Sequence, residues 1–205
     1  MCIRDRTEFV AIIPIKKFVV AKSRLSPVFS NVQRKRIART VFEIVLKEVQ
    51  KSGFKKVWII SNDSLIKAKF GSITGIEVLF DEHYDINKTL QTKFKMAALQ
   101  SLVPVYLPAD LPLITSADIN KILKKSSSGR NLVIIPDRKC IGTNCIVLPK
   151  HLVEDFTPLL GKLSYYSHLS QAKLNGLPIM AFEVFSVSND LDTYEDLQII
   201  RRYLK

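Results

Sequence analysis

A carboxylate lies between two prolines near the middle of the chain, directly after a short apolar stretch. It is Asp110, in the segment Leu107-Pro108-Ala109-Asp110-Leu111-Pro112-Leu113. Burying an ionised carboxylate without a partner is costly, so this position at the end of an expected core strand suggests a bound cation or a dense hydrogen-bond shell. The plain alternative is that Asp110 only caps a turn before the helix that follows Thr115.

A second group of carboxylates comes near the end of the chain. Asp190 and Asp192 are separated by one residue and precede Thr193-x-x-Asp196, a pattern typical of a capping box. An extended backbone directs such a pair to opposite sides, so we take Asp192 as the first choice of metal ligand and Asp190 as the second. Mg²⁺ is usually held by one or two carboxylates plus the phosphates of a substrate, so Asp110 and Asp192 would suffice.

Four cations follow the first apolar run, residues 9–15: Lys16, Lys17, Lys22 and Arg24. Lys16, Lys22 and Arg24 stand in the turn after it, and this turn contains no glycine, which argues against a Gly-rich dinucleotide loop or a Walker loop. Two point charges and one forked guanidinium suit a site that neutralises a triphosphate. A lysine-rich surface loop would have the same composition, so the turn alone leaves both interpretations open.

Strands that alternate with helices must position these residues. Apolar stretches predict strands at 9–15, 57–60, 76–80, 105–107, 132–135, 145–148 and 179–185. Helical spacing or capping signals predict helices from Ser30-x-x-Gln33 to Gly53, at 87–101, from about Ser116, from His151, at 164–176 and from Thr193 to the C-terminus. This alternation indicates an α/β fold, with a mostly parallel sheet and helices on both faces. Such sheets bind ligands beyond the carboxyl ends of their strands.

Length and composition fit one enzyme-sized domain. The chain has 205 residues, of which 47% are apolar, and its 31 basic and 19 acidic residues give a net charge of +12. We expect a leader at residues 1–8, a domain at 9–205 and a cytoplasmic location, because no signal peptide or membrane-length apolar run is present. Three cysteines without metal-like spacing predict neither a disulfide framework nor a zinc site. The charge would attract polyanions, nucleotides among them.

Together these segments resemble the 2-phospho-L-lactate guanylyltransferase family, over about residues 11–197. The motifs that carry the resemblance stand in the family's order: Pro14-Ile15-Lys16, Ala21-Lys22-Ser23-Arg24-Leu25, the segment around Asp110, Pro136-Asp137, Gly142-Thr143-Asn144, Gly161-x-x-Ser164 with His168 beyond it, and Asp190-Leu191-Asp192-Thr193-x-x-Asp196-Leu197.

The resemblance implies an enzyme of deazaflavin coenzyme biosynthesis with a single-domain, Rossmann-like nucleotidyltransferase fold. Such an enzyme transfers GMP from GTP to 2-phospho-L-lactate, or to a related phosphorylated three-carbon acid such as phosphoenolpyruvate, and releases pyrophosphate. By position, the family assigns catalysis to Lys22, Arg24 and Asp110, and Mg²⁺ to Asp110 and Asp192, with Asp190 beside them. Nucleotide binding falls to Lys16, Lys22, Arg24, Asn87, Pro108 and Ala109, and acceptor binding to Thr143, Asn144, Gly161 and Ser164.

Several of these positions have plain structural alternatives. Gly142-Thr143-Asn144 could form only a hairpin turn, and Gly161 and Ser164 could be a loop glycine and a helix N-cap. His168 is expected to be a structural histidine. Asn87 stands where the family has Gly-Leu-Asn, but here Asp85-Ile86 precede it, and Asn87 could itself be an N-cap.

Two other functions compete with the guanylyltransferase. One is another nucleotidyltransferase of the same fold, such as a cytidylyltransferase, which would differ in base selection. The other is a basic nucleic-acid-binding module, which would bind RNA or DNA with nanomolar affinity and steep salt dependence. Aromatic stacking platforms are not evident, and binding alone gives no reason for Asp110 and Asp192. We therefore expect no nucleic acid and no membrane partner, and leave open whether the chain forms a homodimer.

Overall fold

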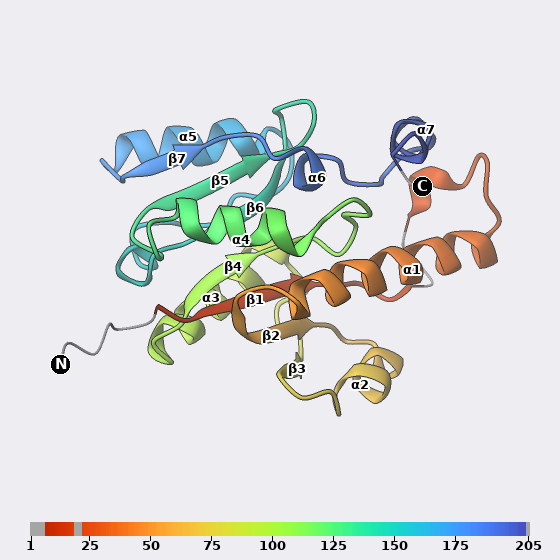
Figure 1. Cartoon of the computed structure of the whole chain (residues 1–205), viewed down its shortest axis with the longest axis horizontal. Helices are drawn as coiled ribbons and strands as arrows, with labels where there is room; N and C mark the ends of the chain where they lie inside the picture. The colour runs from red at the N-terminus through yellow and green to blue at the C-terminus, as the bar shows by residue number, and fades with distance from the viewer. Residues whose placement is uncertain (1–6, 19–21, 204–205) are drawn as a thin grey trace.

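The computed structural model describes residues 7–18 and 22–203, and a seven-stranded sheet forms its centre (Figure 1). Across the sheet the strands follow the order β3-β2-β1-β4-β6-β5-β7. Their bounds are β1 Phe9–Pro14, β2 Phe54–Ile60, β3 Ile76–Leu79, β4 Val103–Tyr106, β5 Leu132–Pro136, β6 Thr143–Val147 and β7 Ile179–Ala181.

One strand of the described sheet runs against the others. β6 pairs antiparallel with both of its neighbours, β4 and β5, and the remaining pairings are parallel. The cause is the short connection at 137–142, because a parallel crossover needs a dozen or more residues. The predicted α/β fold with a mostly parallel sheet is therefore confirmed.

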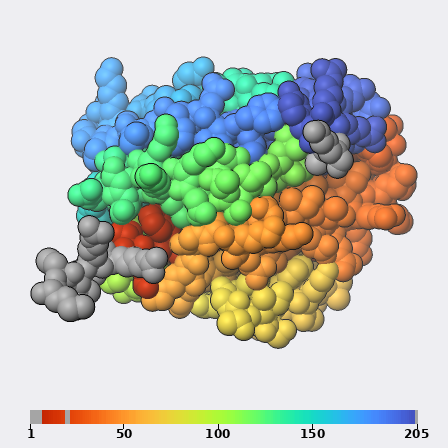
Figure 2. Space-filling model, in the orientation of Figure 1, coloured from red at the N-terminus to blue at the C-terminus, as the bar shows by residue number. Residues whose placement is uncertain are grey.

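Helices cover both faces of the sheet. One face is packed by α1 Asn31–Gln50, α2 Ser64–Phe70, α4 Ser116–Lys125 and α6 Phe185–Ser188, and the other by α3 Ile86–Leu99, α5 Ser164–Leu174 and the 3₁₀ turn η3 Lys150–Leu152. Figure 2 shows α1, in orange, beside α4, in green, on the first of these faces. Residues of β1 alternate between the two cores, as the pleat of a buried strand requires.

The capping signals in the sequence mark where the helices begin. Ser30 and Gln33 form a reciprocal capping box at α1, and Thr193 and Asp196 form another at α7 Tyr194–Arg201. Thr115 caps α4 by accepting the N–H of Asp118. These bonds satisfy N–H groups that a helix leaves free at its first turn, so these predicted starts are confirmed.

Several elements differ from the expectation. The short helix expected from His151 is only the 3₁₀ turn η3. Helix α2, capped by Asp63, was not predicted, since its seven residues supply only two buried positions. β7 stops at Ala181 rather than at residue 185, because α6 begins at Phe185 and the strand pairs with β5 over only three residues. Asp85, and not Asn87, is the N-cap of α3.

Part of the expected leader and of the cationic turn is not described by the structure. Most of the expected leader lies outside the described residues, as do residues 19–21 of the cationic turn and the last two residues. Glu8 is described, and its carbonyl accepts the N–H of Val103 at 2.9 Å, so this residue of the expected leader contacts the sheet. Among the helices described, none combines the length and the apolar character that crossing a membrane requires.

Candidate active site

The candidate site lies at the topological switch point of the sheet, between β1 and β4. β1 and β4 are parallel neighbours, and from them the chain proceeds to opposite sides of the sheet, toward β2 and toward β5. Segments that leave the carboxyl ends of such a pair diverge and leave a crevice for ligands. Here those segments are residues 15–18 and 22–30, which include the 3₁₀ turn η2 Ser23–Leu25, and residues 107–115.

An ammonium group joins the two predicted metal-binding carboxylates. Lys22 Nζ lies 2.7 Å from Asp110 Oδ2 and 3.2 Å from Asp192 Oδ1. The Lys22 side chain is only 6% exposed, while those of Asp110 and Asp192 are 27% and 41% exposed. Burial alone would lower the pKa of Lys22, but the charges of the two carboxylates outweigh it and raise the pKa. The group therefore stays charged, and two acidic side chains 82 residues apart converge on one cation.

Backbone contacts fix this convergence. The N–H of Leu191 donates to the carbonyl of Asp110 at 3.0 Å, so the two acidic segments run side by side. The carboxylate of Asp196 accepts the N–H groups of both Asp192 and Thr193, which sets the start of α7. Its other oxygen accepts from Arg138 at 3.0 Å. Asp192 is thus held by the capping box that follows it.

Negative charge is concentrated at this edge of the sheet. Burial, followed by the charges of Asp110 and Asp192, raises the pKa of Asp190 to about 6. Burial together with all three carboxylates also raises the pKa of the Tyr106 phenol, which stands at the end of β4. The charges of the three carboxylates therefore act on one another and on this phenol, while Lys22 and Arg24 offset part of them.

The cationic turn reaches the same place. Arg24 Nη1 lies 3.3 Å from Asp192 Oδ2, and its side chain is mostly exposed. Lys22, Ser23, Arg24 and Asp192 line a hollow of about 150 Å³. Lys16 is exposed and makes no ion pair within residues 7–18 and 22–203, while Pro108 and Ala109 are half-buried in the segment that carries Asp110. The turn therefore offers charged groups toward solvent beside the carboxylates.

Two predicted acceptor-binding residues, Thr143 and Asn144, lie at a β-bulge in β6. Cys145 pairs with Ile135, whereas Thr143 pairs with Pro136, so Asn144 is the extra residue. Such a bulge re-aims neighbouring side chains. The Asn144 amide donates to the Val187 carbonyl and to Asp190 Oδ1, both at 3.0 Å, so it positions Asp190.

Thr143 turns instead toward α5. Its Oγ1 lies 2.9 Å from His168 Nδ1. Gly142 belongs to the hairpin connection, while Thr143 and Asn144 are already in β6, so the hairpin alternative holds only for Gly142. Ser164 is buried at the first position of α5, and Gly161 precedes it with φ +130°, a conformation that favours glycine. Leu163, and not Ser164, is the N-cap residue.

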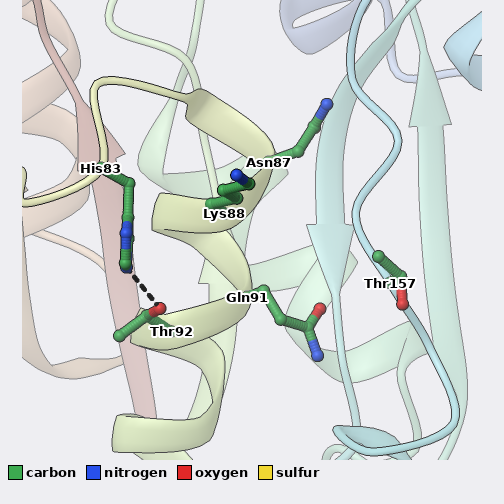
Figure 3. A pocket seen from close by; sticks show the side chains of 6 residues that line it. All are labelled: His83, Asn87, Lys88, Gln91, Thr92 and Thr157. Carbon is green, nitrogen blue, oxygen red and sulfur yellow. Dashed lines mark hydrogen bonds between the residues drawn. The ribbon is translucent and has the colours of Figure 1, made fainter.

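Asn87 is engaged by another part of the chain. Its amide nitrogen donates to the carbonyl of Leu160 at 3.0 Å, and its oxygen accepts the Leu160 N–H at 2.7 Å. Figure 3 shows Asn87, Lys88 and Gln91 projecting from α3 around a cavity of about 290 Å³, with Thr157 on the opposite segment and His83 bonded to Thr92. Asn87 therefore fixes the loop before α5, and its amide is already paired.

The donor set fits a metal held partly by its substrate. Residues 7–18 and 22–203 contain no group of three or more His, Cys, Asp or Glu side chains arranged to hold a metal ion. Asp110 and Asp192 nevertheless already share one cation, the Lys22 ammonium, through oxygen atoms. Oxygen ligands are those that Mg²⁺ prefers, and two carboxylates leave coordination positions for phosphates.

Comparison with known proteins identifies the family of this chain. The sequence model described as "Guanylyl transferase CofC like" matches residues 9–201. The chain belongs to the CofC-like guanylyl transferase family. Its membership makes it a guanylyltransferase, as the motifs in the sequence had indicated.

Relatives of this CofC-like chain carry two related names. It is 30% identical to a 2-phospho-L-lactate guanylyltransferase of Methanothermobacter thermautotrophicus, over 91% of this chain and 81% of that protein. It is equally similar, at 30%, to a phosphoenolpyruvate guanylyltransferase of Rubrobacter xylanophilus, over 91% and 90% of the two chains. A solved structure from Desulfovibrio desulfuricans G20, described as that of a nucleotide-diphospho-sugar transferase, shares the fold with a TM-score of 0.80 at 17% identity, covering 96% of this chain and 87% of that one.

Three residues near the CofC-like site were not given roles by the sequence pattern. The charges of the three carboxylates act on Tyr106, Asp196 holds Asp192, and His168 contacts Thr143. The capping box identified Asp196 only as a helix signal. His168 stands four residues after Ser164. This spacing in a helix could have predicted that both side chains lie on the same face of α5.

Proposed function

We propose that this chain transfers GMP from GTP to a phosphorylated three-carbon acid, 2-phospho-L-lactate or phosphoenolpyruvate, and releases pyrophosphate in deazaflavin coenzyme biosynthesis. The observation that carries the proposal is the convergence of Asp110 and Asp192 on Lys22 at the topological switch point. The names of the relatives support the two acceptors. The cytoplasmic location, the lack of a nucleic acid partner and the possible homodimer stay predictions.

The residues suit a displacement at phosphorus. A phosphate oxygen of the acceptor attacks the α-phosphorus of GTP, a new P–O bond forms, and the bond to the leaving pyrophosphate breaks. The acceptor phosphate is already an anionic nucleophile, so no general base is required. Catalysis then depends on positioning and charge neutralisation, which Lys22 and Arg24 can provide for a polyphosphate.

Asp110 and Asp192 are the residues that would hold Mg²⁺, with Asp190 beside them. When bound there, the ion would neutralise charge on the phosphates of the reactants. Lys22 then needs a new partner for its ammonium, and a triphosphate is the anion that the proposed reaction brings to the crevice. Thr143, Gly161 and Ser164 form the proposed acceptor pocket, at the start of α5, where the positive end of the helix dipole suits an anion.

An activity matrix tests the proposal. The purified chain is incubated with each of the four nucleoside triphosphates and with 2-phospho-L-lactate, phosphoenolpyruvate or 3-phosphoglycerate, with Mg²⁺ or with EDTA, and pyrophosphate release is measured. We expect release only with GTP, Mg²⁺ and one of the first two acids. No release in any combination would refute the proposal, and preference for CTP would transfer it to a cytidylyltransferase.

A further inference from the structure

A buried histidine connects the proposed acceptor pocket to the loop that precedes α5. His168 has no exposed surface, and its ring packs 5.3 Å from that of Phe156. Its Nε2 accepts the backbone N–H of Leu159 at 2.8 Å, and its Nδ1 lies 2.9 Å from Thr143 Oγ1. Both ring nitrogens are therefore in use, one by a loop and the other by a strand.

These two contacts determine where the proton of the ring is. Burial lowers the pKa of His168 to about 4, so the ring is neutral near pH 7 and carries one proton. Since Nε2 accepts from Leu159, that proton must be on Nδ1. Nδ1–H then donates to Thr143 Oγ1, and the hydrogen of the Thr143 hydroxyl must point away from His168.

With its hydrogen directed away from His168, the Thr143 hydroxyl can donate toward the proposed acceptor pocket. Ser164, His168 and Ala172 form the buried face of α5, so Thr143 contacts the same helix face that presents Ser164. The N–H of Tyr165 donates to the carbonyl of Ile141 at 3.0 Å, which ties the first turn of α5 to the β5–β6 connection. A fixed hydroxyl donor favours a negatively charged oxygen.

We propose that His168 is a positioning residue that orients the Thr143 hydroxyl as a donor to an anionic oxygen of the acceptor. The inference rests on the proposed function for the identity of the acceptor. The hydrogen-bond direction itself does not, because it follows from the contacts of Leu159 and Thr143 with the ring.

Two substitutions separate the two contacts of the ring. In His168→Gln the side-chain amide reaches the position of Nε2, so the bond from Leu159 can be kept while the donor to Thr143 is lost. In His168→Asn the amide lies near the position of Nδ1, so the donor to Thr143 can be kept while the bond to Leu159 is lost. We expect His168→Gln to raise the KM for the acceptor about tenfold, with kcat and the KM for GTP changed little, because one bond to a charged oxygen is weakened.

His168→Asn should instead lower the melting temperature and leave the acceptor KM nearer the wild-type value. A merely structural histidine would give the opposite ranking, with the KM for both substrates following the loss of stability. Thr143→Val completes a double-mutant cycle: if His168 acts through the hydroxyl, adding His168→Gln to Thr143→Val should cause no further rise in acceptor KM. A folded His168→Gln variant with wild-type acceptor KM would overturn the proposal.

A spectroscopic measurement tests the orientation independently of turnover. Long-range ¹H–¹⁵N correlation spectra of the wild-type chain at pH 7 should show His168 as the neutral tautomer with its proton on Nδ1. A proton on Nε2 would overturn the inference whatever the enzyme turns over. If no combination of substrates releases pyrophosphate but His168 carries its proton on Nδ1, the proposed function is refuted, while the orientation of the Thr143 hydroxyl by His168 is upheld.

Discussion

Lys22 occupies a position between two carboxylates where a divalent cation could also bind. The sequence predicted that Asp110 and Asp192 would meet, because each was expected to follow an apolar strand of one sheet. In the structure α6 lies between β7 and Asp192, and the two carboxylates meet nevertheless. It did not predict that Asn87 would be paired with the backbone of Leu160, 73 residues away. A side chain's type and its position in a helix do not indicate which distant loop will contact it. Because the Asn87 amide is already bonded to Leu160, the geometry does not support the nucleotide-binding role predicted for it.

Removing either carboxylate charge should impair the reaction more than the fold. We expect Asp110→Asn and Asp192→Asn each to reduce kcat about 100-fold or more, since both amides would bind a divalent cation poorly. The amides keep the shape of the side chains, so circular dichroism and the melting temperature should change little. Asp155→Asn, at an exposed position in the segment after η3, is the matched control and should keep wild-type turnover. Near-normal rates for either site variant would place the cation elsewhere.

Asp190 should make the stability of the chain depend on pH in an unusual direction. Its pKa is raised from 3.8 to about 6, so between these values the folded chain binds a proton that the unfolded chain has lost. Stability should therefore fall as pH rises through about 4 to 6, and the penalty should be complete above about 6. Asp190→Asn cannot ionise, and its amide oxygen can still accept from Asn144.

Urea unfolding in EDTA across this pH range measures the effect. The stability of Asp190→Asn relative to the wild type should increase as pH rises, and above about pH 6 the variant should be the more stable chain. The same comparison for Asp155→Asn should show a much smaller dependence. A constant difference between Asp190→Asn and the wild type across the range would contradict the raised pKa.

Elements whose signals are local were predicted correctly from the sequence. Capping boxes at Ser30 and Thr193 marked α1 and α7, because the bonds that start a helix involve residues three positions apart. The antiparallel direction of β6 was not predicted, although the six residues between β5 and β6 could have shown it. The bulge at Asn144 gave no such signal, since it depends on how β6 pairs with β5.

The capping box of α7 should also affect metal binding. Asp196→Ala removes the acceptor for the N–H groups of Asp192 and Thr193, and with it the ion pair to Arg138. We expect a stability loss of about 1 kcal/mol, typical of a lost cap, and a several-fold rise in the Mg²⁺ concentration that gives half-maximal turnover. Glu195→Ala, at an exposed neighbouring position in the same first turn, is the control and should change neither quantity by as much. A loss of stability without a change in Mg²⁺ dependence would limit Asp196 to capping.

At the scale of the whole molecule, the net charge of +12 acts on anionic substrates before they reach the crevice. Basic side chains are distributed over α1, α4 and the turn after β1, while the site itself contains three carboxylates. At short range the three carboxylates oppose a triphosphate while Lys22 and Arg24 attract it, and the surrounding positive field favours it. Salt affects these two interactions differently. At 0.1 M salt, attraction over distances beyond about 10 Å is largely screened, while contacts within the site are screened much less.

This difference can be measured by varying ionic strength. We expect kcat/KM for GTP to fall several-fold between about 50 and 500 mM KCl, with kcat at saturating substrate nearly constant, because screening affects capture and not the bound state. Lys35→Glu with Arg36→Glu changes two exposed residues at the start of α1 and reduces the net charge by four, from +12 to +8. This double variant should have a lower kcat/KM than the wild type in low salt and the same value in high salt. If the two chains differ equally at every salt concentration, these residues act through a contact with the nucleotide, and the long-range field of the molecule does not explain capture.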